Sequence, residues 1–227
     1  MRLRDIAWQT VLDYAYVGGT RVGHAIHRTV ADALSTGPGT PVLLIPGVYE
    51  TWRYLLAIGS RLNALGHPVH PLPQLGYNVA PIAETAATAQ RYLDERGLEH
   101  VTIVGHSKGG IVGKHMMATD DLDHRIERMV AISSPFSGST RAKYLPVRTL
   151  RPFLPGDELL SSLAANLEIN SRITSIYAET DQVIPNGSEL VGATNLRMPV
   201  VGHFRLLSDP RVVDAVVAAV DPPATGM

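Results

Sequence analysis

The sequence VTIVGHSKGGIV, at residues 101–112, decides the fold because it holds three structural signals in one short stretch. Residues 101–104 form a short, mostly apolar and β-branched run, which is typical of a buried strand. Glycines then stand two residues before and two residues after Ser107, and residues 109–118 carry the pattern of a helix. We therefore predict a tight turn at Ser107 between a buried strand and a helix.

A serine on such a turn has the placement that a catalytic nucleophile requires. Its Oγ must stand clear of the backbone to reach an acyl carbon, and a base must remove its proton. The turn leaves no room for nearby side chains, which accounts for Gly105 and Gly109. The N-terminus of the following helix favours negative charge on a tetrahedral intermediate. We expect His106 to pack in the turn, and not to be the base.

The residue after the serine, Lys108, is predicted to contribute its backbone N–H to an oxyanion hole. Its side chain is either incidental or attracts an anionic acyl substrate. A second donor is needed from the loop after an earlier strand. Residues 46–49 follow the apolar run 42–45 and contain a glycine, so the Val48 N–H is the predicted partner.

The rest of the chain alternates short apolar runs with helical patterns, which is typical of βαβ units around a parallel sheet. The prolines in 68–72 suit an edge strand or a strand end. We expect a mostly parallel central sheet with helices on both faces. The predicted strands are 42–45, 68–72, 101–104, 128–132, 173–177 and 197–201, and the predicted helices are 51–65, 82–96, 109–118 and 210–220.

The chain divides into residues 41–227, one α/β domain, and residues 1–40, an N-terminal helical extension packed on it. The alternative for the extension is a membrane-surface or dimer contact. Residues 134–170 interrupt the alternation of strands and helices with serine, proline and glycine, and then with apolar residues. We expect this segment to form a small cap, either as an acyl-binding lid or as a cover for the sheet edge.

The base is sought among the histidines that follow the turn, because the partners of such a serine come in the order nucleophile, acid, histidine. His115 lies two turns along the helix after Ser107, and His124 lies in a charged, polar run. His203 stands in a glycine-containing loop between the run 197–201 and the last helix. Position and elimination both select His203.

The acid must lie between the serine and this histidine, in a loop after a strand. The run 173–177 is followed by an acidic loop in which Asp181 is the first choice and Glu179 the reserve. Asp181 would accept the Nδ1–H of His203, fix its tautomer and stabilise the imidazolium that forms during the reaction.

The composition excludes several other classes of protein. The formal net charge is -1 and no Lys/Arg run occurs, so we expect no nucleic-acid partner. The chain has no cysteine, which removes disulfides, thiolate metal sites and a cysteine nucleophile. We see neither a signal peptide nor an apolar stretch of about 20 residues, so a cytoplasmic location is the default. Peripheral membrane contact and the oligomeric state stay open.

With these residues assembled, the chain resembles the α/β-hydrolase superfamily, and within it the small bacterial lipases and esterases. The resemblance covers residues 41–220 and rests on five motifs. These are Leu44-Ile45-Pro46-Gly47, the turn at 105–110, Asp181-Gln182-Val183-Ile184-Pro185, Gly202-His203, and Ser134-Pro135-Phe136-Ser137-Gly138-Ser139.

The resemblance implies hydrolysis of a small-molecule or lipid acyl ester through a Ser107, His203 and Asp181 triad, without a cofactor. Two positions depart from the family pattern: Pro46 stands where a histidine is usual, and Phe136 stands where another is usual. We assign no metal-ligand cluster. Acyl transfer or thioester cleavage by the same triad, and non-catalytic binding on the same fold, remain alternatives.

Overall fold

The computed structural model describes residues 12, 13, 15, 31–121, 123–144 and 148–222. Six strands form one sheet in the order β2-β1-β3-β4-β5-β6, and every strand pair described is parallel. The prediction of a largely parallel sheet is therefore confirmed. The strands are β1 (Val42–Ile45), β2 (Val69–Pro71), β3 (Val101–His106), β4 (Ile126–Ile132), β5 (Ile173–Thr180) and β6 (Thr194–Val201).

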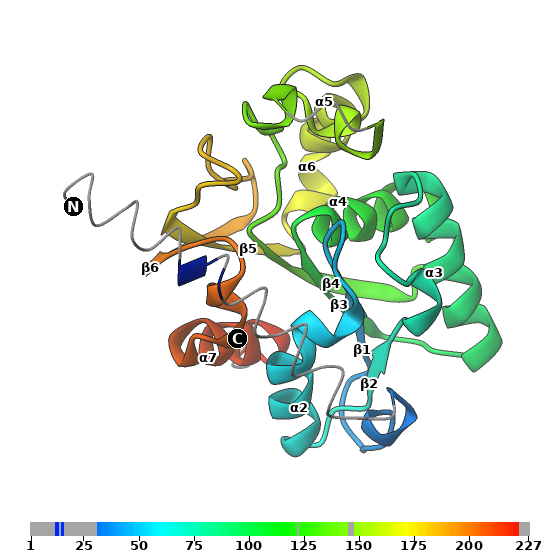
Figure 1. Ribbon diagram of the computed structural model, residues 1–227. Helices are drawn as coiled ribbons and strands as arrows, with labels where there is room; N and C mark the ends of the chain where they lie inside the picture. Colours follow the sequence, from blue (N-terminus) through cyan, green and yellow to red (C-terminus); the bar gives the residue numbers. More distant parts are fainter. Residues whose placement is uncertain (1–11, 14, 16–30, 122, 145–147, 223–227) are drawn as a thin grey trace.

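Helices cover both faces of this sheet, as predicted (Figure 1). Side chains that alternate along β1 explain why. Leu43 and Ile45 belong to a core shared with α3 and α4, whereas Val42 and Leu44 belong to a core shared with α2 and α7. The α-helices are α2 (Leu56–Ala64), α3 (Ile82–Arg96), α4 (Lys108–His115), α5 (Glu158–Ala165), α6 (Leu167–Asn170) and α7 (Pro210–Val220).

The strand order places a topological switch point between β1 and β3. The chain runs from β1 to β2 on one side and then crosses back to β3 on the other. In open parallel sheets, ligands bind in the crevice at the carboxyl ends of the strands beside such a switch. β1 ends at Ile45 and β3 at His106, so this crevice is formed by the loop at 46–50 and the turn at Ser107.

Several element boundaries differ from the prediction: β3 continues to His106, β4 begins at Ile126, β6 begins at Thr194 and β2 is shorter, at Val69–Pro71. The strand expected at 173–177 continues to Thr180, because Ala178 and Thr180 also pair with β6. The helix expected at 109–118 begins at Lys108 and changes to a π-helical turn, η4 (Met116–Asp120). The helix expected at 51–65 begins as a 3-10 turn, η2 (Trp52–Leu55).

The described residues between β4 and β5, 133–144 and 148–172, lie outside the sheet, and we call them the β4–β5 segment (Figure 1). They contain α5 and α6 and two 3-10 turns, η5 (Ala142–Tyr144) and η6 (Arg148–Phe153). The remaining 3-10 turns are η1 (Ala31–Leu34), η3 (Pro73–Leu75) and η7 (Arg205–Ser208). None of the helices in the described ranges is long and apolar enough to span a bilayer.

Candidate active site

Ser107 lies between β3 and α4 with its backbone in a sparsely populated conformation. Its φ is 51° and its ψ is -117°, and its N–H donates to the Ile132 carbonyl oxygen at 2.8 Å. Positive φ is costly for a residue with a Cβ, and such strain concentrates at functional sites. The hydrogen bond to the end of β4 helps to hold this conformation.

The two glycines around Ser107 allow α4 to approach the sheet closely. A Cβ on Gly105 would lie 2.6 Å from the Gly109 carbonyl carbon. A Cβ on Gly109 would collide with the Ile45 carbonyl oxygen at the end of β1. Any larger side chain at either position would therefore move the first turn of α4 away from β1 and β3.

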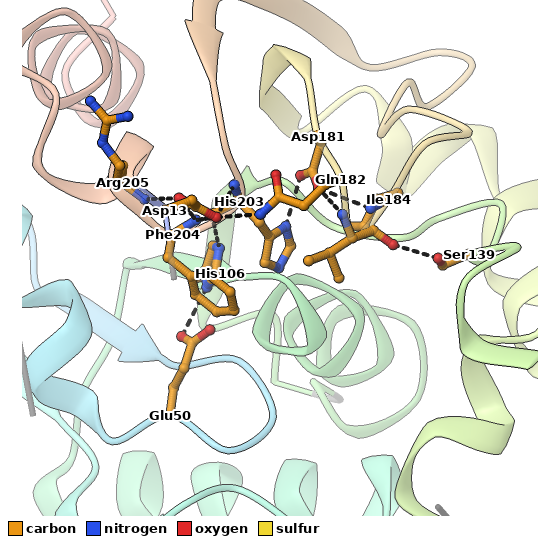
Figure 2. A network of polar contacts seen from close by, with 11 residues as sticks. Asp13, Glu50, His106, Ser139, Asp181, Gln182, Ile184, His203, Phe204 and Arg205 are labelled. Carbon is orange, nitrogen blue, oxygen red and sulfur yellow. Dashed lines mark hydrogen bonds and ion pairs between the residues drawn. The ribbon is translucent and has the colours of Figure 1, made fainter. Parts of the chain in front are cut away.

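His203 and Asp181 form a buried pair at the carboxyl ends of β5 and β6. His203 Nδ1 lies 2.7 Å from Asp181 Oδ2, and their side chains are 2% and 5% exposed. The other oxygen of Asp181, Oδ1, accepts the backbone N–H groups of Val183 at 2.8 Å and Ile184 at 2.9 Å. Both carboxylate oxygens are thus engaged, which fixes the orientation of the imidazole (Figure 2).

The pair shifts the pKa of each partner toward the charged form. Burial alone would raise the pKa of Asp181, but the His203 charge and hydrogen bond, with the Ile184 and Val183 N–H groups, hold it below its ordinary value. Burial alone would lower the pKa of His203, but Asp181, followed by Glu50 and Asp13, raises it above 6.5. An imidazolium at this position is accordingly well stabilised.

The other sequence candidates lie elsewhere. Glu179, the reserve acid, pairs with Arg197 at 3.4 Å on the exposed surface. His115 lies 3.8 Å from Asp120 near the end of α4. His124 is exposed in the loop before β4. Only the Asp181 and His203 pair combines burial with a direct hydrogen bond among these candidates.

A second buried network links the turn at Ser107 to the loop after β1. Glu50 Oε2 accepts the Gly47 N–H at 2.9 Å and lies 2.8 Å from His106 Nδ1. His106 Nε2 lies 3.0 Å from the His203 carbonyl oxygen, and the rings of His106 and His203 are 4.7 Å apart. Both ring nitrogens of His106 are therefore engaged in buried polar contacts. Figure 2 shows Glu50, His106 and His203 in line.

The Lys108 side chain does not reach the space beside Ser107. Its Nζ donates to the carbonyl oxygens of Asn78 at 2.8 Å and Ala80 at 2.5 Å, and to Asn78 Oδ1 at 2.9 Å. Asn78 Nδ2 in turn donates to the Pro46 carbonyl oxygen at 2.7 Å. Burial lowers the pKa of Lys108 to about 8. The reading in which this ammonium attracts an anionic substrate therefore has no support from its position.

A pocket of about 70 Å³ adjoins Ser107 and is lined mostly by apolar groups. Val48, the predicted oxyanion donor, lines it together with residues of the β4–β5 segment and of the loop after β5. A larger hollow of about 490 Å³ lies at the amino ends of β4, β5 and β6, and it contains none of the predicted site residues. The small pocket beside Ser107 is therefore the candidate substrate site. Its lining comprises Val48, Ser107, Pro135, Ser139, Arg141, Ala142, Phe153, Val183 and Ile184.

One cluster in the described part of the chain has the composition of a cation site. Ligand atoms of Glu50, His106 and His203 lie within 4.8 Å of one another. Hydrogen bonds already use Glu50 Oε2, both ring nitrogens of His106, and Nδ1 of His203. The donor set fits a hydrogen-bonded network better than a metal site, since both ring nitrogens of His106 already have polar partners.

Sequence reasoning missed three residues that support this site: Asp13, Glu50 and Asn78. Asp13 accepts the backbone N–H of His203 at 2.9 Å from 190 residues away. Asn78 and Glu50 contact the Pro46-Gly47 turn. For Glu50, its position directly after the predicted oxyanion loop is a signal that could have been followed. For the other two, no local pattern separates them from solvated residues.

Comparison with known proteins agrees with the fold. A family model described as a PGAP1-like alpha/beta domain matches residues 77–144. Aspergillus fumigatus lipase B has a TM-score of 0.66 and 17% identity, over 86% of this chain and 55% of that one. A Paleococcus ferrophilus monoacylglycerol lipase has a TM-score of 0.57 and 18% identity, over 80% and 95%.

A third similar structure is an extracellular α/β-hydrolase from a Paenibacillus species. Its TM-score is 0.57 and its identity 17%, over 82% of this chain and 100% of that one. At identities this low, the structural similarity shows the fold and does not show the reaction. The chain has the α/β-hydrolase fold, and it resembles the lipases and esterases that share this fold.

Proposed function

We propose that the protein hydrolyses carboxylic esters, with Ser107 as nucleophile, His203 as general base and Asp181 as the residue that orients the base. The observation that carries this proposal is the buried hydrogen bond of 2.7 Å between His203 Nδ1 and Asp181 Oδ2. It stands at the end of the sheet where the strained turn places Ser107 beside an apolar pocket. Fixing Nδ1 as the donor leaves Nε2 as the nitrogen that can accept a proton.

The first half of the reaction forms an acyl-enzyme. Ser107 Oγ attacks the acyl carbon while its proton passes to His203 Nε2, and the carbonyl π electrons move onto oxygen. The N–H groups of Val48 and Lys108 donate to this oxyanion. The N–H of Lys108 belongs to the first turn of α4, where backbone donors have no partner within the helix. The ester C–O bond then breaks, and His203 returns the proton to the departing alcohol.

The second half releases the acid. A water molecule attacks the acyl carbon of the ester formed with Ser107, and His203 Nε2 takes the proton of this water. The tetrahedral intermediate collapses, the bond to Ser107 Oγ breaks, and His203 reprotonates Oγ. The Asp181 carboxylate remains ionised throughout and stabilises each imidazolium.

The pocket beside Ser107 supports a short acyl group. Its volume of about 70 Å³ is roughly half of the ~150 Å³ cavity that holds a benzene molecule in an engineered protein. Pro135, Ala142, Phe153 and Ile184 give it an apolar lining that favours hydrocarbon over charge. We therefore propose acyl groups of a few carbon atoms as substrates.

Labelling by a fluorophosphonate tests the nucleophile directly. We expect the wild-type chain to bind the probe covalently through Ser107 Oγ, with loss of fluoride, and Ser107→Ala to lose both labelling and ester hydrolysis. Ser137→Ala is the control, since this serine is exposed in the β4–β5 segment, after β4. Undiminished labelling of Ser107→Ala would show that another residue is the nucleophile.

Hydrolysis of p-nitrophenyl esters from acetate to palmitate tests the acyl pocket. We expect the highest kcat/KM for short chains, because a methylene group that does not fit changes selectivity by about 1–3 kcal/mol. Val183→Ala enlarges the pocket and keeps the backbone N–H that donates to Asp181. The acyl chain length with the highest kcat/KM should therefore increase in this variant. An optimum at palmitate in the wild-type chain would contradict the short acyl group.

A further inference from the structure

The loop that carries His203 is held by a carboxylate from the N-terminal part of the chain. Asp13 accepts the backbone N–H groups of three successive residues, His203 at 2.9 Å, Phe204 at 3.0 Å and Arg205 at 2.7 Å. The Gln182 side-chain amide donates to the same carboxylate. Asp13 is fully buried, and Figure 2 shows it at the centre of these donors.

The buried carboxylate of Asp13 depends on these hydrogen bonds for its stability. Removing an isolated carboxylate from water is costly, and such groups persist only when hydrogen bonds compensate them. Three consecutive backbone N–H groups that converge on one anion form a concave nest, which fixes the backbone conformation of the loop. The position of the His203 backbone therefore depends on Asp13.

The conformation of Gly202 gives a second, independent sign that the loop is shaped around Asp13. Its φ is +115°, a region that side chains rarely adopt. A Cβ at Gly202 would lie 2.5 Å from Asp13 Oδ1, so the loop approaches the carboxylate too closely for any other residue.

Asp13 also connects the two loops that carry the base and the acid. Gln182 follows Asp181 directly in the chain, and its amide binds the carboxylate that holds the His203 backbone. We propose that Asp13 is a positioning residue of the active site, which sets the relative placement of His203 and Asp181 from the N-terminal segment. This inference rests on the proposed function.

The acid limb of the pH profile distinguishes an effect of the Asp13 charge on His203 from a purely structural role of Asp13. The titratable groups near His203 are the carboxylates of Asp181, Glu50 and Asp13 and the ring of His106, and the Phe204 ring also packs on the His203 ring at 4.9 Å. Each of the three carboxylates raises the pKa of His203 against the effect of burial. Removing the charge of Asp13 should therefore lower this pKa and move the acid limb of the pH profile to lower pH.

The test compares Asp13→Asn and Asp13→Ala with Asp32→Asn in the full chain. Asp32→Asn removes the same charge from an exposed side chain, 75% exposed, whose partner is Arg96 at 3.5 Å. We measure kcat and KM for a p-nitrophenyl ester over a pH series, with active sites counted by fluorophosphonate titration. Both Asp13 variants should lose about 10–100-fold in kcat per titrated site with KM within about twofold. Asp13→Asn should also show the acid limb at lower pH, and Asp32→Asn should change neither.

Counting active sites keeps the result decisive where a variant folds poorly, because unfolded chains lower the number of sites and leave the kcat per site unchanged. A wild-type kcat per site and an unmoved acid limb in Asp13→Asn would overturn the inference. If Ser107→Ala were inactive at the same time, the proposed function would stand without it. Activity that survives in Ser107→Ala would instead overturn the proposed function itself.

Discussion

At the scale of single residues, the candidate site depends on charges that surround one imidazole. Asp181, Glu50 and Asp13 together raise the pKa of His203 above 6.5, against the effect of burial. A base works only while it is unprotonated, so a raised pKa moves the onset of activity to higher pH. The same charges therefore reduce activity at low pH and stabilise the imidazolium that forms when His203 takes the proton of Ser107.

This arrangement predicts the pH dependence of catalysis. As pH rises, His203 loses its proton, and kcat/KM should increase along a limb whose apparent pKa lies above the ordinary 6.5 of histidine. The measurement is kcat/KM for a p-nitrophenyl ester across the acid and neutral range, which reports the free enzyme. A limb centred below 6.5 would contradict the raised pKa of His203.

Glu50 is the residue that couples the predicted oxyanion loop to the turn at Ser107. It holds the Gly47 N–H at 2.9 Å and His106 Nδ1 at 2.8 Å. Glu50→Gln keeps the size of the side chain but replaces the carboxylate that contacts the Gly47 N–H and His106 Nδ1 by an amide. We expect kcat to fall about tenfold or more, because a small displacement of catalytic groups is costly.

The control for this change is Glu95→Gln on the exposed side of α3. It removes the same charge far from the buried network, and its kcat should equal that of the wild type. Equal kcat values for Glu50→Gln and Glu95→Gln would show that the Glu50 and His106 contacts do not position the oxyanion loop.

At the scale of elements, the helices and strands were largely predictable because their signals are local. α3 ends at Arg96 and is capped by Gly97, whose φ of 57° and ψ of 38° are left-handed and suit glycine. α7 begins with Pro210 after Asp209, whose side chain accepts the Arg211 N–H. The bounds predicted for both helices match the structure for this reason.

The parts that the sequence did not predict depend on partners far along the chain. β5 extends to Thr180 because Ala178 and Thr180 pair with residues of β6, which lie about 20 positions further along the chain. Asp13 meets His203 across 190 residues, and Asn78 meets Pro46 across 32. The supporting residues of the site are set by the fold, whereas the turn at Ser107 is set by its own glycines.

Lys108 joins three elements at the site, and its replacement tests that connection. Its Nζ binds the carbonyl oxygens of Asn78 and Ala80 and Asn78 Oδ1, so α4, the loop before α3 and the Pro46 turn are linked. Lys108→Met fills the same space but leaves the carbonyl oxygens of Asn78 and Ala80 without this donor, whereas Asn78 Oδ1 keeps the Thr85 hydroxyl. Unpaired buried polar groups cost about 1–3 kcal/mol each, so we expect lower stability in urea and a lower kcat.

Lys143→Met is the matched control for Lys108→Met, because this lysine is exposed in η5. Its free energy of unfolding and its kcat should match those of the wild type. If Lys108→Met were as stable and as active as Lys143→Met, the contacts of Lys108 with Asn78 and Ala80 would contribute neither to stability nor to catalysis.

At the scale of the whole molecule, the stability of the fold should depend on two buried lysines. Lys114 is fully buried on α4, where its Nζ donates to Asn170 Oδ1 of α6 and lies 5.5 Å from the Phe136 ring. Burial lowers its pKa to about 8, as it does for Lys108. In the folded chain each of these lysines is therefore less favourable as an ammonium than as a neutral amine. Lys114 nevertheless links the helix after Ser107 to the β4–β5 segment.

The sign of the pH dependence follows from proton counting. Between pH 8 and the ordinary lysine value of 10.5, the unfolded chain still holds a proton on Lys114 while the folded chain has released it. Stability rises with pH wherever the unfolded state binds more protons. The free energy of unfolding should therefore increase from pH 8 to pH 10, by up to about 2 kcal/mol for each buried lysine.

Replacing Lys114 isolates its share of this increase. In Lys114→Met the titrating group is absent, so urea unfolding at pH 8, 9 and 10 should show a rise smaller than that of the wild type by about 2 kcal/mol. Comparing the rise, and not the stability at one pH, separates the titration of Lys114 from the loss of its hydrogen bond to Asn170. Lys143→Met, which removes an exposed lysine, should keep the full wild-type rise. An equal rise in Lys114→Met and Lys143→Met would mean that Lys114 stays charged in the folded protein over this pH range. The Phe136 ring and Asn170 would then stabilise its ammonium more strongly than burial destabilises it.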